Sequence, residues 1–218
     1  TIDSKGISLT PSIAACPTAR AKGEPTWAVL LQKDGPPPVS GDPVVLTDQG
    51  QTAKRESSPD RIRFTYESLT DGKKKWRVGL TLDFHRQGDA FEVTGEIAND
   101  EPGYVVCGFT GPVLSGIQAD LAKYPALLPE GFGKRISRVP DGKGKPAPWL
   151  GAGKRFEIAS YYPSNRGTMQ WCALAGERGG LYLGCHDAAH GAKGFCVRYD
   201  SQDKQLGLAI KHLAFCAA

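Results

Sequence analysis

The segment 184–191 holds the residues best suited to proton transfer. It contains His186, Asp187 and His190. An imidazole next to a carboxylate can serve as a general acid or base near neutral pH, because the ordinary pKa of histidine is about 6.5. If the chain is an enzyme, we expect His186 to act as the acid and Asp187 or Glu157 to act as the base.

The same segment does not have the pattern of a metal site. His186 and His190 are four residues apart, a spacing that brings two imidazoles together only on a helix. Gly184 and Gly191 on either side favour a strand that leads into a loop. None of the six cysteines forms a CxxC pair, and the sequence has no glycine-rich phosphate loop, GxSxG elbow or HExxH motif. The sequence therefore predicts neither a metal nor a cofactor.

Three aromatic residues lie where they could contact a sugar ring, whose CH faces stack on indole and phenol rings. Trp149 follows a Pro-Ala-Pro sequence in a segment rich in glycine, proline and lysine, and Tyr161 and Tyr162 precede Pro163 at the end of a strand. With His186 and Asp187 they make up the predicted ligand-binding set. The alternative is that the three aromatic residues cap the open ends of a sandwich.

Most of the chain that must position these residues alternates between apolar and polar side chains. From Trp76 to Phe84, five apolar residues stand at every second position. This period of two predicts a strand with one face in a core and the other in water. Turn sequences such as Asp71-Gly72 favour antiparallel hairpins between the strands. Similar alternating runs cover residues 61–67, 91–97 and 206–211.

A further hairpin is predicted just before His186. Met169, Trp171 and Ala173 alternate with polar or small residues, and after a glycine-rich turn Leu181 and Leu183 do the same, with Cys185 next on that face. We interpret these apolar residues as the one packed face of the hairpin.

Helices and loops complete the predicted architecture. The best helix candidate is residues 117–128, which Pro125 limits to a turn or two. Residues 1–25 read as irregular, and residues 129–154 read as a long loop of the kind that is often functional or mobile. The sequence predicts a single all-β domain over residues 1–218, an antiparallel two-sheet sandwich.

Charge and hydropathy narrow the classes of partner. The net charge is +4, and the densest lysine clusters, at residues 73–75 and 143–145, lie beside Asp-Gly turns. A nucleic-acid-binding protein concentrates its basic residues on one face with aromatic residues between them, so we expect no nucleic-acid partner. No apolar run approaches the roughly 18 residues of a membrane span.

The six widely spaced cysteines are compatible either with disulfides or with buried free thiols.

One stretch resembles a known family. It runs from Tyr162-Pro163 through Met169-Gln170-Trp171 and Gly179-Gly180-Leu181-Tyr182-Leu183 to His186-Asp187, about 26 residues in all. It resembles the N-terminal galactose-mutarotase-like β-sandwich of bacterial glycoside-hydrolase-like proteins, in which the sandwich precedes a (β/α)8 barrel.

The resemblance implies a secreted or periplasmic bacterial protein of carbohydrate metabolism. In that family the catalytic carboxylates belong to the barrel, which would follow this chain and is its implied partner. We therefore expect a non-catalytic sandwich that supports or edges an active site on the downstream barrel. Two alternatives stay open: a stand-alone carbohydrate-binding module, and a mutarotase-like or lyase-like sugar enzyme that uses His186 with Asp187 or Glu157.

Overall fold

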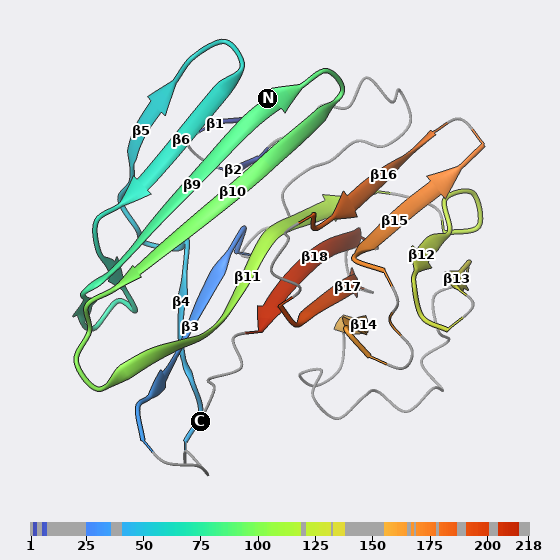
Figure 1. Ribbon diagram of the computed structural model, residues 1–218. Helices are drawn as coiled ribbons and strands as arrows, with labels where there is room; N and C mark the ends of the chain where they lie inside the picture. The colour runs from blue at the N-terminus through green and yellow to red at the C-terminus, as the bar shows by residue number, and fades with distance from the viewer. Residues whose placement is uncertain are drawn as a thin grey trace. The chain divides into compact units, whose positions relative to one another are not determined.

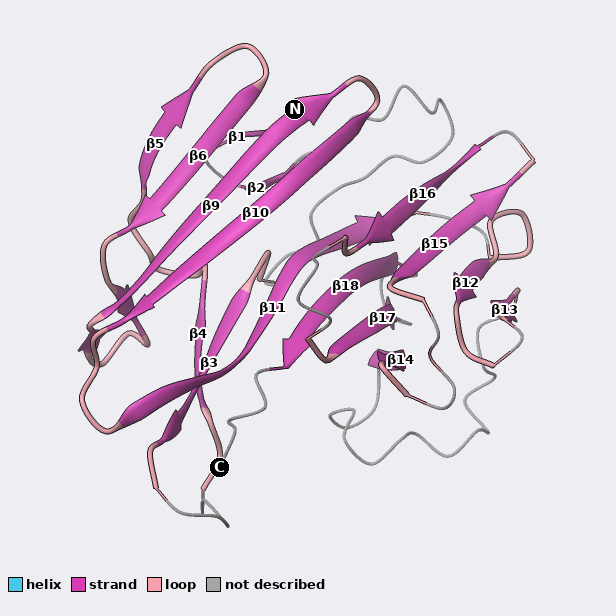
Figure 2. Ribbon diagram, in the orientation of Figure 1, coloured by secondary structure: helices cyan, strands magenta, loops and turns pink. Residues whose placement is uncertain are grey.

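All regular structure in the described part of the chain is β-strand, arranged in antiparallel sheets without a helix (Figure 2). The all-β antiparallel sandwich fold predicted from the alternation is thereby confirmed. The computed structural model describes residues 2–3, 6–7, 25–35, 41–118, 121–131, 133–137, 155–164, 167, 169–177, 179–186, 191–200 and 205–213.

The chain divides into two compact units. The first contains residues 1–26 and 110–214, and the second contains residues 27–109. The long strand β11 (Tyr104–Ile117) contributes its beginning to the second unit and its end to the first. That residues 1–218 make one domain stays a prediction.

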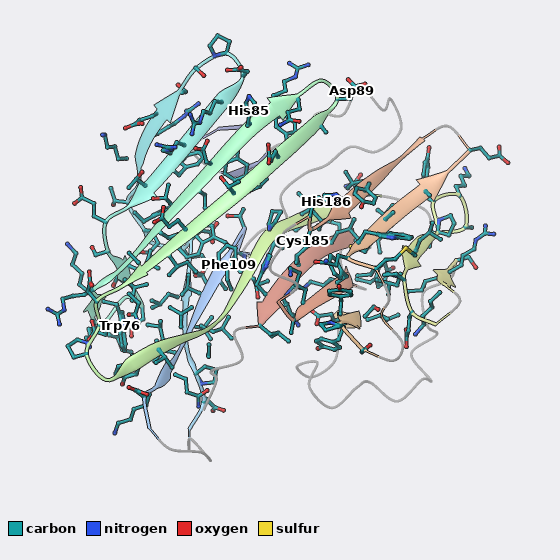
Figure 3. The ribbon with its side chains drawn as sticks, viewed as in Figure 1. Trp76, His85, Asp89, Phe109, Cys185 and His186 are labelled. Carbon is teal, nitrogen blue, oxygen red and sulfur yellow. The ribbon has the colours of Figure 1, made fainter. Side chains whose placement is uncertain are left out.

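The second unit contains a four-stranded sheet whose order is β10-β9-β6-β5 (Figure 1). Leu80, Leu82 and Phe84 are buried on one face of β9, as their alternation predicts. In Figure 3, Trp76 lies near one end of this sheet, and Asp89 lies at the other end, in the turn between β9 and β10. The strands of this part are β5 (Lys54–Ser57), β6 (Arg61–Tyr66), β7 (Leu69–Thr70), β8 (Lys75–Trp76), β9 (Val78–Gln87) and β10 (Ala90–Asn99).

Two more strands of the second unit, β3 (Ala28–Lys33) and β4 (Val44–Thr47), pair with each other. Alternate residues Val29, Leu31 and Leu46 are completely buried, so one face of this pair is packed. The Trp27 ring makes an edge contact with the Tyr66 ring of β6 at 5.1 Å between centroids. These apolar side chains form the core of the unit together with the apolar face of the four-stranded sheet.

The first unit is built from two sheets and a small ribbon. One sheet has the order β14-β17-β18 followed by the end of β11, and the other has the order β13-β12-β15-β16. The ribbon pairs β1 (Ile2–Asp3) with β2 (Gly6–Ile7). The strands of the two sheets are β12 (Ala126–Leu128), β13 (Lys134–Ile136), β14 (Arg155–Tyr162), β15 (Trp171–Gly176), β16 (Gly179–Gly184), β17 (Lys193–Asp200) and β18 (Gln205–Leu213).

The core of the first unit lies between its two sheets. Phe195 and Leu208 point into it from β17 and β18, and Cys172 and Leu174 point into it from β15. All four side chains are at most 2% exposed. Burying a large apolar side chain contributes about 1.5–3 kcal/mol to stability, so this core is the main force that holds the two sheets together.

The structure corrects the expected helix at residues 117–128. There, β11 ends at Ile117, a turn covers residues 121–124, and Ala126 begins the strand β12. Pro125 cannot donate a helical hydrogen bond, and Ala126 and Leu128 take alternate positions with their side chains in the core. The apolar residues of this segment, read as one helix face, belong to the end of β11, a turn and the short strand β12.

The segments predicted as irregular contain short strands. The strand β13 lies inside the expected loop 129–154 and pairs with β12. The ribbon of β1 and β2 lies inside the expected irregular segment 1–25. Residues 138–154, which include Trp149, lie outside the described residues, as do residues 8–24.

Candidate functional site

The predicted hairpin exists as β15 and β16, but its packed face differs from the prediction. Pairing starts at Gly176 and Gly179, which places Leu174 opposite Leu181 and Cys172 opposite Leu183. Opposed residues of an antiparallel pair share a face, so the core-facing leucines of β16 bring Cys172 and Leu174 into the core with them. Trp171 and Met169 therefore belong to the outer face, and their assignment to the packed face was wrong.

The outer face of this hairpin carries three side-chain rings in series, which we call the aromatic row: Trp171, Tyr182 and His186. The centroids of the Trp171 and Tyr182 rings are 6.1 Å apart with 28° between their planes. The centroids of the Tyr182 and His186 rings are 6.3 Å apart with 23° between their planes. Tyr182 is 55% exposed, and His186 is also exposed. The row is a nearly parallel set of rings that water can reach.

Gly184 makes room for the central ring of the row. A Cβ on Gly184 would stand 2.5 Å from the Oη of Tyr182 and 2.6 Å from its Cε1. The Tyr182 ring therefore lies across the backbone of Gly184, two residues further along the same strand. Its freedom is further reduced by the neighbouring ring of Trp171, whose indole N–H donates to the Met169 sulfur at 3.4 Å. These contacts place the Tyr182 and Trp171 rings beside each other without a ligand.

The row combines apolar ring faces with polar edges. Partial burial raises the pKa of the Tyr182 hydroxyl above its ordinary value, so this group is neutral at physiological pH and can both donate and accept hydrogen bonds. His186 follows the end of β16, as Figure 3 shows, and adds two ring nitrogens. Ring faces that stack on CH groups, with hydrogen-bonding groups at their edges, are suited to an amphipathic ligand.

The other predicted binding residues are dispersed. Tyr162 packs against the core of the first unit. Tyr161, its neighbour in the same strand, points to the opposite face of the sheet and is 48% exposed. Asp187 and Trp149, like His190, lie outside the described residues, so their roles stay predictions.

Glu157 and His186 do not form a catalytic pair. Ile158 and Tyr162 of β14 pack into the core, so Glu157 points to the outer face of its sheet. His186 contacts Tyr182 on the outer face of the other sheet. Because packed sheets lie about 10 Å apart, two side chains on opposite outer faces cannot share a proton or a substrate bond.

Glu157 instead forms two ion pairs on its own sheet. Its Oε2 accepts from the Arg198 Nε at 2.8 Å, and its Oε1 accepts from the Lys211 ammonium. Burial by itself would raise the pKa of Glu157, but the hydrogen bonds and charges of Lys211 and Arg198 outweigh burial and lower it. Glu157 is therefore ionised at neutral pH.

The described residues contain no cluster suited to a metal ion, and two of their thiols are unreactive. They contain no group of three or more His, Cys, Asp or Glu side chains that could hold a metal ion. Cys172 and Cys196 are free and completely buried, and burial raises the pKa of each thiol to about 12. Thiols with this pKa are poor nucleophiles at neutral pH.

The described part of the chain contains no helix long and apolar enough to cross a membrane.

Comparison with known proteins does not identify the chain's function. No family model matches the chain, and neither the curated proteins nor the solved structures gave a significant match. His186 was a candidate from the sequence and its role stays a prediction, whereas the sequence pattern did not single out Trp171 and Tyr182. The signal that finds them is the register of the hairpin, which follows once Gly176 and Gly179 are placed at its turn.

Proposed function

We propose that this chain is a non-catalytic, carbohydrate-binding β-sandwich and that its ligand stacks on the aromatic row of Trp171, Tyr182 and His186. The observation that carries the proposal is the row itself: nearly parallel rings, one of them 55% exposed, on the outer face of a two-stranded hairpin. Sugar rings present flat CH faces to such rings and direct their hydroxyls toward the polar edges.

Preorganisation supports a binding role over a structural one. A core tyrosine is stabilised by burial, but Tyr182 leaves more than half of its surface in water while a glycine is kept under its ring. An exposed ring that already rests against its neighbours loses little conformational entropy when a ligand binds to it. The arrangement therefore favours affinity for a ligand over stability of the fold.

The context of the proposal comes from the sequence resemblance. The segment that resembles galactose-mutarotase-like sandwiches of bacterial glycoside-hydrolase-like proteins includes both strands of the hairpin that carries the row. We therefore propose a secreted or periplasmic carbohydrate-active parent protein, whose catalytic residues lie on a downstream barrel. The sandwich would hold the polysaccharide beside that active site.

The test is isothermal titration calorimetry against a panel of neutral oligosaccharides. We expect at least one to bind the wild-type chain. Tyr182→Ala should weaken that binding about tenfold, since an aromatic stacking contact contributes about 1–1.5 kcal/mol, whereas Tyr182→Phe should keep most of the affinity.

Phe91→Ala is the matched control, because Phe91 is 41% exposed but lies on β10 in the second unit. Its affinity should equal that of the wild type. Flat titrations across the whole panel, or equal losses in Tyr182→Ala and Phe91→Ala, would contradict the proposal.

A further inference from the structure

The first unit carries a second unusual surface, on the outer face of the sheet β14-β17-β18. On this face Glu157 of β14 pairs with Arg198 of β17. Tyr161 of β14 pairs with Gly194 of β17, and Gly194 pairs with Lys211 of β18. We call these four side chains, Glu157, Arg198, Lys211 and Tyr161, the charged face. It is separate from the aromatic row, which lies on the outer face of the other sheet.

Small residues form the floor of the charged face. Ala159, Cys196 and Ala209 stand opposite one another on the three strands, between the rows of Glu157 and Tyr161. Cys196 and Ala209 are completely buried. A floor this low lets the long side chains of Arg198 and Lys211 lie along the sheet and meet at Glu157, as their hydrogen bonds require.

The charged face has a net charge of +1. Glu157 neutralises one of its two basic partners, and both of its oxygens already accept a hydrogen bond. Arg198 binds Glu157 through Nε alone, and no hydrogen bond joins its two terminal nitrogens to the described residues. The side chains of Arg198 and Lys211 remain 24% and 27% exposed. Donors are therefore left over for an anion from solution.

A flat ring borders these donors. Tyr161 is 48% exposed, and a Cβ on Gly194 would stand 3.0 Å from the Cε1 of Tyr161. The ring thus lies across Gly194, which is the only residue between Tyr161 and Lys211 in the register of the three strands. The same Cβ would stand 3.6 Å from the Cβ of Lys211, so the Tyr161 ring and the Lys211 side chain flank Gly194 from its two sides.

We propose that the charged face is a binding site for an acidic sugar, a hexuronate. The sugar ring stacks on Tyr161, and its carboxylate pairs with Lys211 and the terminal nitrogens of Arg198. An exposed ring beside the donors favours an acidic sugar over a free inorganic anion, because a phosphate or sulfate ion has no face to place on Tyr161. The charge of +1 favours an acidic sugar over a neutral one.

The test compares galacturonic acid with galactose, which differ only in the group at C6, by saturation-transfer NMR with the full chain. We expect the wild type to bind galacturonic acid at least about fivefold more tightly, as for a partly exposed charge pair. Lys211→Met and Arg198→Gln should each reduce this preference, and Lys211→Arg should retain it. Tyr161→Ala should weaken binding of galacturonic acid, whereas Tyr182→Ala should leave the preference unchanged.

Several results would overturn the proposal. The proposal fails if the wild type binds the two sugars equally, or if inorganic phosphate binds as tightly as galacturonic acid. It also fails if the preference survives both Lys211→Met and Arg198→Gln, or if the preference is lost in Tyr182→Ala. If the substitutions unfold the chain, shifts of the Tyr161 ring and Lys211 ammonium resonances in the wild type give the same answer. Because the neutral oligosaccharides are assigned to the aromatic row, either site can fail while the other stands.

Discussion

The ring of Tyr182 lies across Gly184, two residues further along the same face of β16, with its Oη 2.5 Å from the point where a side chain at position 184 would begin. Only glycine leaves that space empty. The position of the ring is thus determined by the absence of a neighbouring side chain, and the aromatic row depends on a residue that carries no chemistry of its own.

Gly184→Ala should therefore reduce ligand binding without unfolding the protein. The new methyl group must push the Tyr182 ring away, but the ring is the far end of a flexible side chain and is exposed, so it can move at little cost. We expect a loss of oligosaccharide affinity of several-fold, on the order of that for Tyr182→Ala, and a change in the free energy of unfolding below about 1 kcal/mol. Calorimetry and urea unfolding measure the two quantities.

Gly95→Ala is the control for this substitution. Gly95 lies in β10, where a Cβ would meet the Cδ2 of Leu82 at an ordinary 3.4 Å and no other side chain within 4 Å. This variant should bind like the wild type. Equal affinities of Gly184→Ala and the wild type would show that the position of Tyr182 is unimportant.

Glu157→Gln should destabilise the protein at neutral pH. It leaves Arg198 and Lys211 partly buried without their carboxylate, which we expect to cost about 1–3 kcal/mol of unfolding free energy. The pKa of Glu157 is lowered in the folded protein, so its stabilising effect is present above its ordinary pKa of 4.5 and is lost as the pH falls through the lower, folded-state pKa. The unfolding free energies of the wild type and the variant should therefore converge in acid.

Urea unfolding between pH 7 and pH 2 measures this difference. Other carboxylates, such as Asp83 beside Arg61 and Arg63, also have a lowered pKa, so the difference between variant and wild type is informative and the wild-type curve alone is not. Glu56→Gln removes an exposed pair with Lys54 and should change stability little at any pH. A Glu157→Gln curve parallel to the wild type at all pH values would contradict the ionised role of Glu157.

Cys172 and Cys196 should resist alkylation in the folded protein. With a pKa of about 12, roughly one thiol in ten thousand is ionised at pH 8, and both side chains are inaccessible. Iodoacetamide labelling followed by mass spectrometry should modify these residues only after unfolding in urea. Modification of either residue in the native protein at the rate of a free cysteine would show that the core opens readily.

The strands could be predicted from the sequence because period-two alternation is a local signal. The runs that contain Leu82, Phe64 and Leu208 all became strands; the expected residues are buried in the runs of Leu82 and Leu208 and half-buried in the run of Phe64. Local signals failed where the partner strand decides the outcome. Trp171 belongs to the outer face because Gly176 and Gly179 fix the register of the hairpin, and that information lies outside the alternating run itself.

The candidate site could be predicted only in part for the same reason. His186 was recognisable by residue type, but Tyr182 looked like an ordinary strand residue until its position over Gly184 was known. Glu157 was a reasonable candidate base by residue type, and its ion pairs with Arg198 and Lys211 depend on pairings between strands 41 and 54 residues apart. Tertiary pairings of this length leave no trace in a local sequence pattern.

The central claim is that a sugar ring stacks on the aromatic row. The most direct measurement is an NMR titration of the chain, labelled in its aromatic rings, with the neutral oligosaccharide that binds most tightly in calorimetry. We predict saturable shifts of the Trp171, Tyr182 and His186 ring resonances and nuclear Overhauser contacts from sugar CH protons to the Tyr182 ring. Saturable binding that leaves these three rings unshifted would contradict the claim.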